Sequence, residues 1–294
     1  MSELKSNCGV TVGTFDGVHR GHKAVLEFLV RECASRGLIP RVITFNPHPM
    51  AVVNPERSPK LLESIEERVG RLREIGVQVE VVSFTEELRR TTAAEWLQLL
   101  KEKYCAKLLV AGYDNRFGYD GMKMSVEDYA RLASEIGIET LTAPVVKEVS
   151  SSRIRNLLKE GEVEEAARLL GGYYKVSGMV EHGKELGRKI GFPTANVAVS
   201  DDRLIPAPGV YAADAEISGA GKYRAVVNIG VAPTVGDGLP MTIEVHILDF
   251  SGDIYGKKLA ISFIERLRSE RRFESLELLT RQIEIDAERA REAK

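Results

Sequence analysis

The chain has 294 residues, of which 44% are hydrophobic and 29% charged, and its formal net charge is −2 at neutral pH. A chain of this length can hold two domains with separate cores, and the composition is that of an ordinary globular protein. The weak net charge, without any lysine- and arginine-rich run, argues against a nucleic-acid partner. Because no apolar run approaches membrane-spanning length, we expect no membrane partner either.

The three cysteines, Cys8, Cys33 and Cys105, are widely spaced and form no Cys-x-x-Cys pair. Such spacing predicts neither a disulfide framework nor a zinc site. Reduced thiols, and an N-terminus that lacks the pattern of a secretion signal, favour a cytoplasmic location.

Residues 13–22 (GTFDGVHRGH), which we call the histidine loop, follow a β-branched run and precede a helical pattern. Glycines at a strand-to-helix turn let the backbone approach a ligand, and the free N–H groups of the new helix favour an anion. His19 and His22 share one face of the first helical turn, so both can reach one phosphate group. A glycine turn alone is weak evidence, because most such turns bind nothing. The two histidines make a phosphate site the better interpretation.

Up to about residue 171, strand and helix patterns alternate, which predicts a parallel sheet covered on both faces. We expect strands at residues 10–12, 41–45, 77–82, 108–111 and 139–142. We expect helices from the histidine loop to Gly37, from Ser58-Pro59 to Gly76, from Thr92 to Leu100, from Ser125 to Ile136, and two short ones before Gly171-Gly172. Ligands bind beyond the carboxyl ends of the strands in such sheets, where four turns carry unusual residues.

After Tyr173, short β-rich runs between glycine and proline turns predict a small antiparallel barrel or sandwich. We expect its strands at residues 174–180, 209–217, 223–229, 241–250 and 259–264. A last helix, from about Ser275 to Arg291, is expected to bury Leu276, Leu279, Ile283 and Ala287. The predicted fold is therefore α/β, with a Rossmann-like parallel-sheet domain at 1–172 and an antiparallel β-barrel domain with a terminal helix at 173–294.

If ATP lies over the histidine loop, attack on its α-phosphorus builds negative charge on the non-bridging oxygens, which calls for preplaced donors. His19 and His22 fit that role. Arg155 can hold the leaving pyrophosphate with two parallel hydrogen bonds, and Ser151 and Ser152 open a helix that offers a second anion site. Taken alone, this serine-rich segment is more simply a helix cap followed by solvated arginines. The histidine loop shifts that balance.

The histidine loop resembles the HxGH signature of the nucleotidyltransferase superfamily, in the version found in bacterial FAD synthetases. Residues 44–49, 112–118 and 149–155 resemble three further motifs of that family, in the family's order. The resemblance implies a catalytic role for His19, His22 and Arg155 and a flavin contact by Asn46. It also implies an ATP and phosphate site made by Gly13, Phe15, Asp16, His19, His22, Asp114, Ser151, Ser152 and Arg155.

Two positions depart from this family pattern: Asn115 stands where an aromatic residue is common, and Ser152 replaces a threonine. His48 has two open interpretations, a turn histidine bonded to local backbone or a ligand contact.

Residues 182–196 form a second glycine-rich stretch, which alone predicts a hairpin with a flexible basic loop. The stretch is similar to an element of riboflavin kinases. By that resemblance Gly183, Gly187 and Gly191 line ATP, while the Thr194 hydroxyl and the Asn196 carbonyl oxygen bind Mg²⁺ and the ATP phosphates.

Alternation along residues 241–247 places Glu244 on the polar face of a strand, where a lone glutamate is usually only solvated. The segment resembles the riboflavin-kinase strand whose glutamate is the base that phosphorylation of an alcohol requires. Residues 209–211, 228–234 and 268–273 resemble other segments of that family, and the last implies that Arg268 and Phe273 border the flavin. Ala232 replaces a common arginine.

Both motif sets occur in the order of the prokaryotic bifunctional riboflavin kinase/FAD synthetase family. The resemblance implies that the second half converts riboflavin and ATP to FMN, that the first half converts FMN and ATP to FAD and pyrophosphate, and that both reactions need Mg²⁺. Two alternatives are a superfamily member with another acceptor, such as a pantetheine or choline phosphate, and a flavin-responsive regulator without turnover. The kinase-like half argues against the first, and the complete set of reactive residues argues against the second. The oligomeric state is left open.

Overall fold

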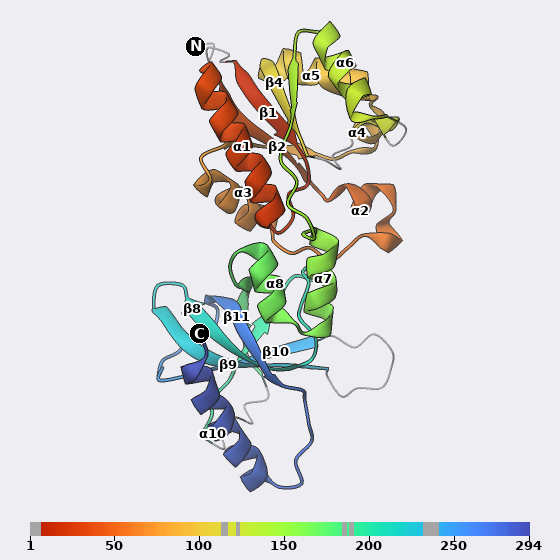
Figure 1. Ribbon diagram of the computed structural model, residues 1–294. Coiled ribbons are helices and arrows are strands. Elements are labelled where there is room, and N and C mark those ends of the chain that lie inside the picture. The colour runs from red at the N-terminus through yellow and green to blue at the C-terminus, as the bar shows by residue number, and fades with distance from the viewer. Residues whose placement is uncertain (1–6, 113–116, 122–123, 184–186, 188–190, 232–240) are drawn as a thin grey trace. The chain divides into compact units, whose positions relative to one another are not determined.

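The computed structural model describes residues 7–112, 117–121, 124–183, 187, 191–231 and 241–294. The chain forms two compact units, Met1–Ser150 and Ser151–Lys294 (Figure 1). In the second unit, helix α7 (Ser151–Glu160) packs on α8 (Val163–Leu170), and α8 packs on strands of the barrel. None of the helices within the described ranges has the length and apolar character needed to cross a bilayer.

The first unit contains a five-stranded parallel sheet, which confirms the predicted parallel sheet, and its strand order is β3-β2-β1-β4-β5. Its strands are β1 (Cys8–Val12), β2 (Ile39–Asn46), β3 (Gln78–Ser83), β4 (Ala106–Ala111) and β5 (Glu139–Thr142). β1 is central, and the chain continues to β2 on one side before it crosses to β4 on the other. The histidine loop therefore leaves the sheet where the strand order reverses, which is where ligands bind in open α/β sheets.

Helices cover both faces of this sheet (Figure 1). α1 (Arg20–Arg36) and α3 (Ile65–Glu74) pack on one face, and α5 (Ala93–Tyr104) and α6 (Val126–Glu135) on the other. The connections contain α2 (Pro49–Val53), a 3-10 turn at Pro55–Arg57 and α4 (Glu86–Arg90). The predicted end of α1 is confirmed by Gly37, its C-cap, which has a φ of 63°. The predicted start of α5 is confirmed by a capping box between Thr92 and Glu95.

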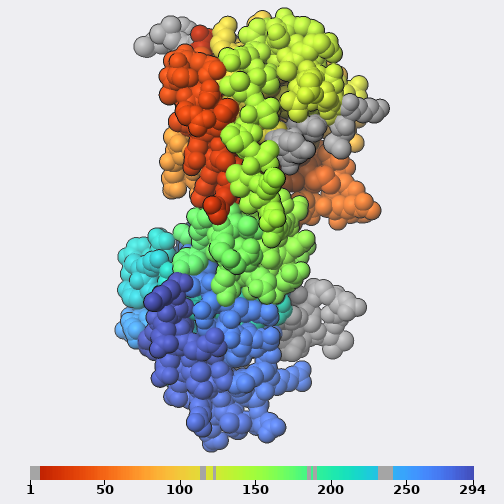
Figure 2. All heavy atoms as spheres, in the orientation of Figure 1, coloured from red at the N-terminus to blue at the C-terminus, as the bar shows by residue number. Residues whose placement is uncertain are grey.

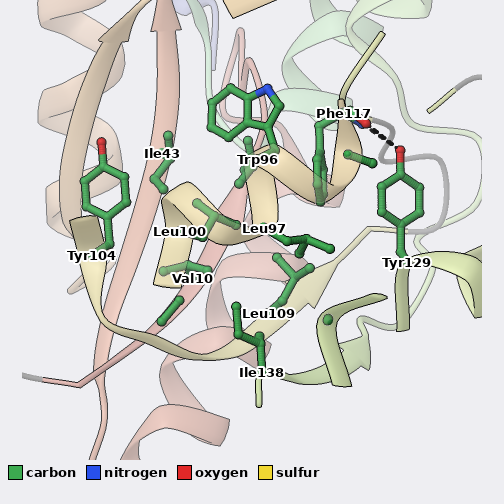
Figure 3. Packing of buried hydrophobic residues seen from close by; sticks show 14 of the residues in the cluster. Val10, Ile43, Trp96, Leu97, Leu100, Tyr104, Leu109, Phe117, Tyr129 and Ile138 are labelled. Atoms are coloured by element: carbon green, nitrogen blue, oxygen red, sulfur yellow. Dashed lines mark hydrogen bonds between the residues drawn. The ribbon is translucent and has the colours of Figure 1, made fainter. Parts of the chain in front are cut away.

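Side chains that alternate along the strands point to opposite faces of the sheet and belong to two separate hydrophobic cores. Val42 packs under α1 and α3, whereas its neighbour Ile43 packs with Trp96 on the opposite face (Figure 3). In the second core Phe117 lies between Trp96 and Tyr129, and the Tyr129 hydroxyl donates to the Phe117 carbonyl oxygen at 2.6 Å. This bond fixes the end of the predicted motif at residues 112–118.

The predicted helix start at Ser58-Pro59 is wrong. α3 begins at Ile65, where Ser64 is the N-cap and forms a capping box with Glu67. The preceding segment is held out of the helix because the backbone N–H groups of Leu62 and Glu63 donate to the buried carboxylate of Asp16. A tertiary contact thus overrides a good local start signal.

The second unit is a closed antiparallel barrel in the order β10-β7-β6-β11-β8-β9, which confirms the predicted barrel. Its strands are β6 (Tyr174–Glu181), β7 (Ala195–Ala198), β8 (Gly209–Ile217), β9 (Gly221–Val231), β10 (Met241–Ile247) and β11 (Lys258–Arg268). The sequence does not predict β7 as a strand, because its first residues lie inside the glycine-rich stretch. Tyr174 and Tyr211 pack against Phe263 in the core.

The last helix, α10 (Leu276–Glu292), packs on β8, β9 and β11 through its C-terminal half (Figure 1). Of the predicted buried stripe, Ala287 is buried and Leu279 and Ile283 are half-buried, whereas the prediction is wrong at Leu276, which is 63% exposed. The buried residues are Asp286, Ala287 and Ala290, whose small or paired side chains let the helix approach the barrel closely.

Candidate active sites

The histidine loop begins directly after β1, and His19 is the N-cap of α1. The backbone N–H of His22 donates to Nδ1 of His19 at 3.2 Å. Because a backbone N–H can only donate, Nδ1 carries a lone pair and the proton of a neutral His19 lies on Nε2. The Nε2–H group is therefore a hydrogen-bond donor at the start of a helix, where the dipole favours an anion.

The two imidazoles stack, with ring centroids 3.6 Å apart and an angle of 15° between planes. Phe15 packs against His22 edge to face, with ring centroids 5.1 Å apart. A Cβ on Gly21 would come within 3.2 Å of the His19 ring, and one on Gly13 within 3.1 Å of the Phe15 ring. Gly13 and Gly21 therefore leave the space that the rings of Phe15, His19 and His22 occupy, and Phe15 packs against the stacked histidines.

Asp16 has no exposed surface, and its carboxylate binds backbone just before α3. It accepts from the backbone N–H groups of Leu62 at 3.1 Å and Glu63 at 3.3 Å, and Arg68 lies 3.9 Å away. These contacts anchor the histidine loop to the start of α3. A direct contact between Asp16 and ATP stays a prediction.

Two further residues of the predicted motifs, Asn46 and His48, lie at the carboxyl end of β2. Asn46 is exposed at the end of β2. His48 caps α2 and accepts from the Met50 N–H at 3.1 Å, which supports the interpretation of a histidine bonded to local backbone. Asp114 and the unusual Asn115 lie outside the described residues.

The segment between β5 and α7 lies beside α1 on the surface of the first unit (Figure 2). The carbonyl oxygen of Val149 would be 3.9 Å from a Cβ on Gly21, so the start of the motif at residues 149–155 reaches the histidine loop. The rest of that motif belongs to the second unit, where α7 begins at Ser151 as predicted and carries Ser152 and the buried Arg155. Their joint action with the histidines stays a prediction.

The second candidate site is a row of polar residues across three barrel strands. Glu244 on β10 pairs directly with Asn196 on β7 and with Asn228 on β9. Directly paired residues point to the same face of a sheet, and the buried neighbours Ile243 and Val245 occupy the other face. Glu244 is therefore flanked by two amide side chains on the outer wall of the barrel. In the sequence, Asn228 is marked only as one residue of the segment 228–234.

Two described glycines of the glycine-rich stretch, Gly183 and Gly187, lie close to the predicted ligands Asn196 and Thr194. A Cβ on Gly183 would lie only 1.8 Å from Nδ2 of Asn196, and one on Gly187 would lie 2.2 Å from the Phe192 carbonyl oxygen and 3.4 Å from Oγ1 of Thr194. Gly191 has a φ of 85°, a conformation that favours glycine. The glycines thus allow the backbone to fold closely over the two predicted magnesium ligands.

Arg268 holds β11 to α10. Its guanidinium donates to the buried carboxylate of Asp286 at 2.8 Å and 3.0 Å, and its Cζ lies 5.7 Å from the centroid of the Phe273 ring. The ion pair of Arg268 with Asp286 thus has a structural role. A flavin contact by Arg268 or Phe273 stays a prediction. Ala232 lies outside the described residues. Among the described residues, no group of three or more His, Cys, Asp or Glu side chains is arranged so that it could hold a metal ion.

Comparison with known proteins relates each unit to one enzyme family. Residues 1–156 match the family model for FAD synthetase, and residues 170–294 match the model for riboflavin kinase. The chain is 36% identical to a bifunctional riboflavin kinase/FMN adenylyltransferase of Bacillus subtilis over 99% of this chain and 93% of the relative. It is also 36% identical to the Escherichia coli K12 protein of the same name, over 98% and 93% of the two chains.

A solved structure from Streptococcus pneumoniae, described as a macrolide-efflux protein, has a TM-score of 0.89 and 34% identity. The match covers 98% of this chain and 95% of that one, so the two proteins share both units.

The fold and the two family models define a two-domain transferase, with a parallel-sheet unit for nucleotidyl transfer and a barrel unit for phosphoryl transfer. The chain belongs to the family of bifunctional riboflavin kinases/FMN adenylyltransferases. It is an enzyme of flavin cofactor biosynthesis.

Proposed function

We propose that Glu244 is the general base of the riboflavin kinase reaction. Its carboxylate takes the proton from the 5′-hydroxyl of riboflavin as that oxygen attacks the γ-phosphorus of ATP. The bond from the γ-phosphorus to the bridging oxygen breaks, and ADP leaves. The observation that supports this assignment is the direct pairing of Glu244 with Asn196, which brings a carboxylate beside a predicted phosphate and metal ligand.

The donor set next to Glu244 fits Mg²⁺. The Thr194 hydroxyl and the Asn196 carbonyl oxygen are the hard oxygen ligands that this ion prefers, and they leave room for water and phosphate oxygens. The close approach of Gly183 to Asn196 supports the fit, because the cradle has no space for a larger side chain. When bound, the ion would neutralise charge on the ATP phosphates.

For the adenylyltransferase reaction, His19 and His22 donate hydrogen bonds to the α-phosphate oxygens of ATP. The phosphate of FMN attacks the α-phosphorus, the bond to the β-phosphate bridge breaks, and pyrophosphate leaves. No proton has to be removed from the nucleophile, so donors suffice. Arg155, Ser151 and Ser152 hold the leaving pyrophosphate. The stacked pair of imidazoles at the start of α1 supports this assignment.

Two point variants test the separation of the reactions. Glu244→Gln should abolish FMN formation from riboflavin while FAD formation from supplied FMN continues. His22→Ala should have the opposite effect. Loss of both activities in either folded variant would contradict two independent sites.

A substrate panel addresses the remaining alternatives. The purified protein incubated with riboflavin, ATP and Mg²⁺ should yield FMN and FAD, with no transfer to a pantetheine or choline phosphate. An absence of any flavin product, with flavin still bound, would favour the regulator. The cytoplasmic location stays a prediction.

A further inference from the structure

The histidine loop has an unfavourable backbone conformation that other residues must hold in place. Phe15, Gly17 and Val18 have φ angles of 50°, 86° and 31°. Positive φ disfavours residues with a Cβ, so Phe15 and Val18 are strained. Such a loop keeps one shape only where the surrounding structure restrains it. The shape matters here because His19 follows Val18 directly.

The restraint comes from helix α3. Nη1 of Arg71 donates to the Gly17 carbonyl oxygen at 3.1 Å, and its Nη2 donates to the Val18 carbonyl oxygen at 3.3 Å. The Val18 carbonyl belongs to the peptide bond that joins Val18 to His19. One guanidinium therefore fixes the peptide plane from which the His19 imidazole extends.

Arg68, one turn earlier on the same face of α3, holds the other side of the loop. Its Nη1 donates to the Thr14 carbonyl oxygen at 2.9 Å and to the Phe45 carbonyl oxygen at 3.2 Å. The Thr44 hydroxyl donates to the same Thr14 oxygen at 2.9 Å. Arg68 is only 2% exposed and is therefore committed to this role.

The contacts also run in the opposite direction. The Asp16 carboxylate of the loop accepts from the N–H groups of Leu62 and Glu63, just before α3, and Glu63 pairs with Arg71. Acidic and basic groups thus join the loop and α3 along several residues. The carbonyl oxygens of Thr14, Gly17 and Val18 are thus held by arginines of α3.

From this network we infer that Arg71 and Arg68 are positioning residues for adenylyl transfer, which rests on the proposed role of His19 and His22. They hold the strained loop so that the stacked imidazoles already point where charge develops on the α-phosphate. Preorganised donors act mainly in the transition state. Losing Arg71 should therefore lower kcat for FAD synthesis more than it changes KM.

The test uses the full chain and both of its reactions. Arg71→Met should lower kcat for FAD formation about 10- to 100-fold, the scale expected when a catalytic group is slightly misplaced. KM for ATP should change less than about 3-fold. Arg71→Lys, which keeps the positive charge and one donor, should recover part of the loss. FMN formation by the same preparation should equal that of the wild type.

Two matched variants separate positioning from general effects of charge. Arg73→Met removes an exposed arginine from the same helix and should leave both reactions unchanged. Glu63→Gln removes the ion pair but keeps the carbonyl contacts of Arg71, so it should retain most of the FAD synthesis. Wild-type kcat in Arg71→Met, or an equal fall in both reactions, would overturn the inference. If His22→Ala also kept its FAD synthesis, the proposed function itself would fail, whatever Arg71 did.

Discussion

Nδ1 of His246 lies 2.9 Å from the carbonyl oxygen of Pro193, the residue before Thr194. His246 is two residues after Glu244 on β10, so both extend from the same face of the strand. Phe192 packs edge-on against the imidazole, with ring centroids 5.4 Å apart. One histidine thus ties the predicted magnesium-ligand segment to the strand that carries the predicted base.

We expect His246→Ala to weaken riboflavin kinase activity about 5- to 10-fold, the scale of one lost hydrogen bond. The effect should appear mainly as a higher requirement for Mg²⁺-ATP, because the segment that holds Thr194 is less well fixed. Titration of FMN formation with Mg²⁺-ATP measures this. His246→Gln, which keeps a hydrogen-bond donor, is the conservative control. An unchanged titration in His246→Ala would show that the contact of His246 with Pro193 does not position the predicted magnesium ligands.

Gly183→Ala should reduce FMN formation at least 10-fold. The added methyl group would lie 1.8 Å from Nδ2 of Asn196, so the amide must move away from its place beside Glu244. A Cβ on Gly172 would have open space among the described residues, which makes Gly172→Ala the matched control. The measurement is the initial rate of FMN formation for the two variants. Equal rates would show that the close approach of Gly183 to Asn196 does not matter for the kinase reaction.

In the first unit, Gly21→Ala should lower FAD synthesis and spare FMN formation. Its methyl group would press on the His19 ring from 3.2 Å and tilt the stacked pair. Gly70→Ala on α3 has open space within the described ranges and should instead stabilise the fold by about 0.5–1 kcal/mol, because alanine is the better helix former. Assays of both reactions and thermal unfolding check the pair. An unaltered FAD rate in Gly21→Ala would count against the stack as the working arrangement.

Burial raises the pKa of the Cys33 thiol from 9.0 to about 11. The folded state therefore binds this proton more tightly than the unfolded state does, and the resulting stability is present below pH 9 and lost as the pH rises toward 11. By pH 10.5 the loss amounts to about 2 kcal/mol. Urea unfolding, followed by the fluorescence of Trp96, should show that Cys33→Ala loses less stability than the wild type between pH 8 and 10.5. Parallel losses would contradict the shift.

The strand and helix order of both units follows from local patterns. Apolar runs and caps such as Thr92 with Glu95 act over a few residues, so their structures agree with the prediction. The errors arise where distant contacts compete with local signals. At Ser58-Pro59 the carboxylate of Asp16 holds the following segment out of a helix, and on α10 the pair of Arg268 with Asp286 decides which face is buried.

By itself, the sequence determined the two chemistries, because His19, His22 and Glu244 lie in motifs whose spacing depends only on neighbours along the chain. Only the tertiary structure decided how these groups are held. Arg71 reaches the carbonyl of Val18 from another helix, and Asn228 lies beside Glu244 through strand pairing. Such contacts depend on how distant segments of the chain pack together, so a local sequence pattern cannot predict them.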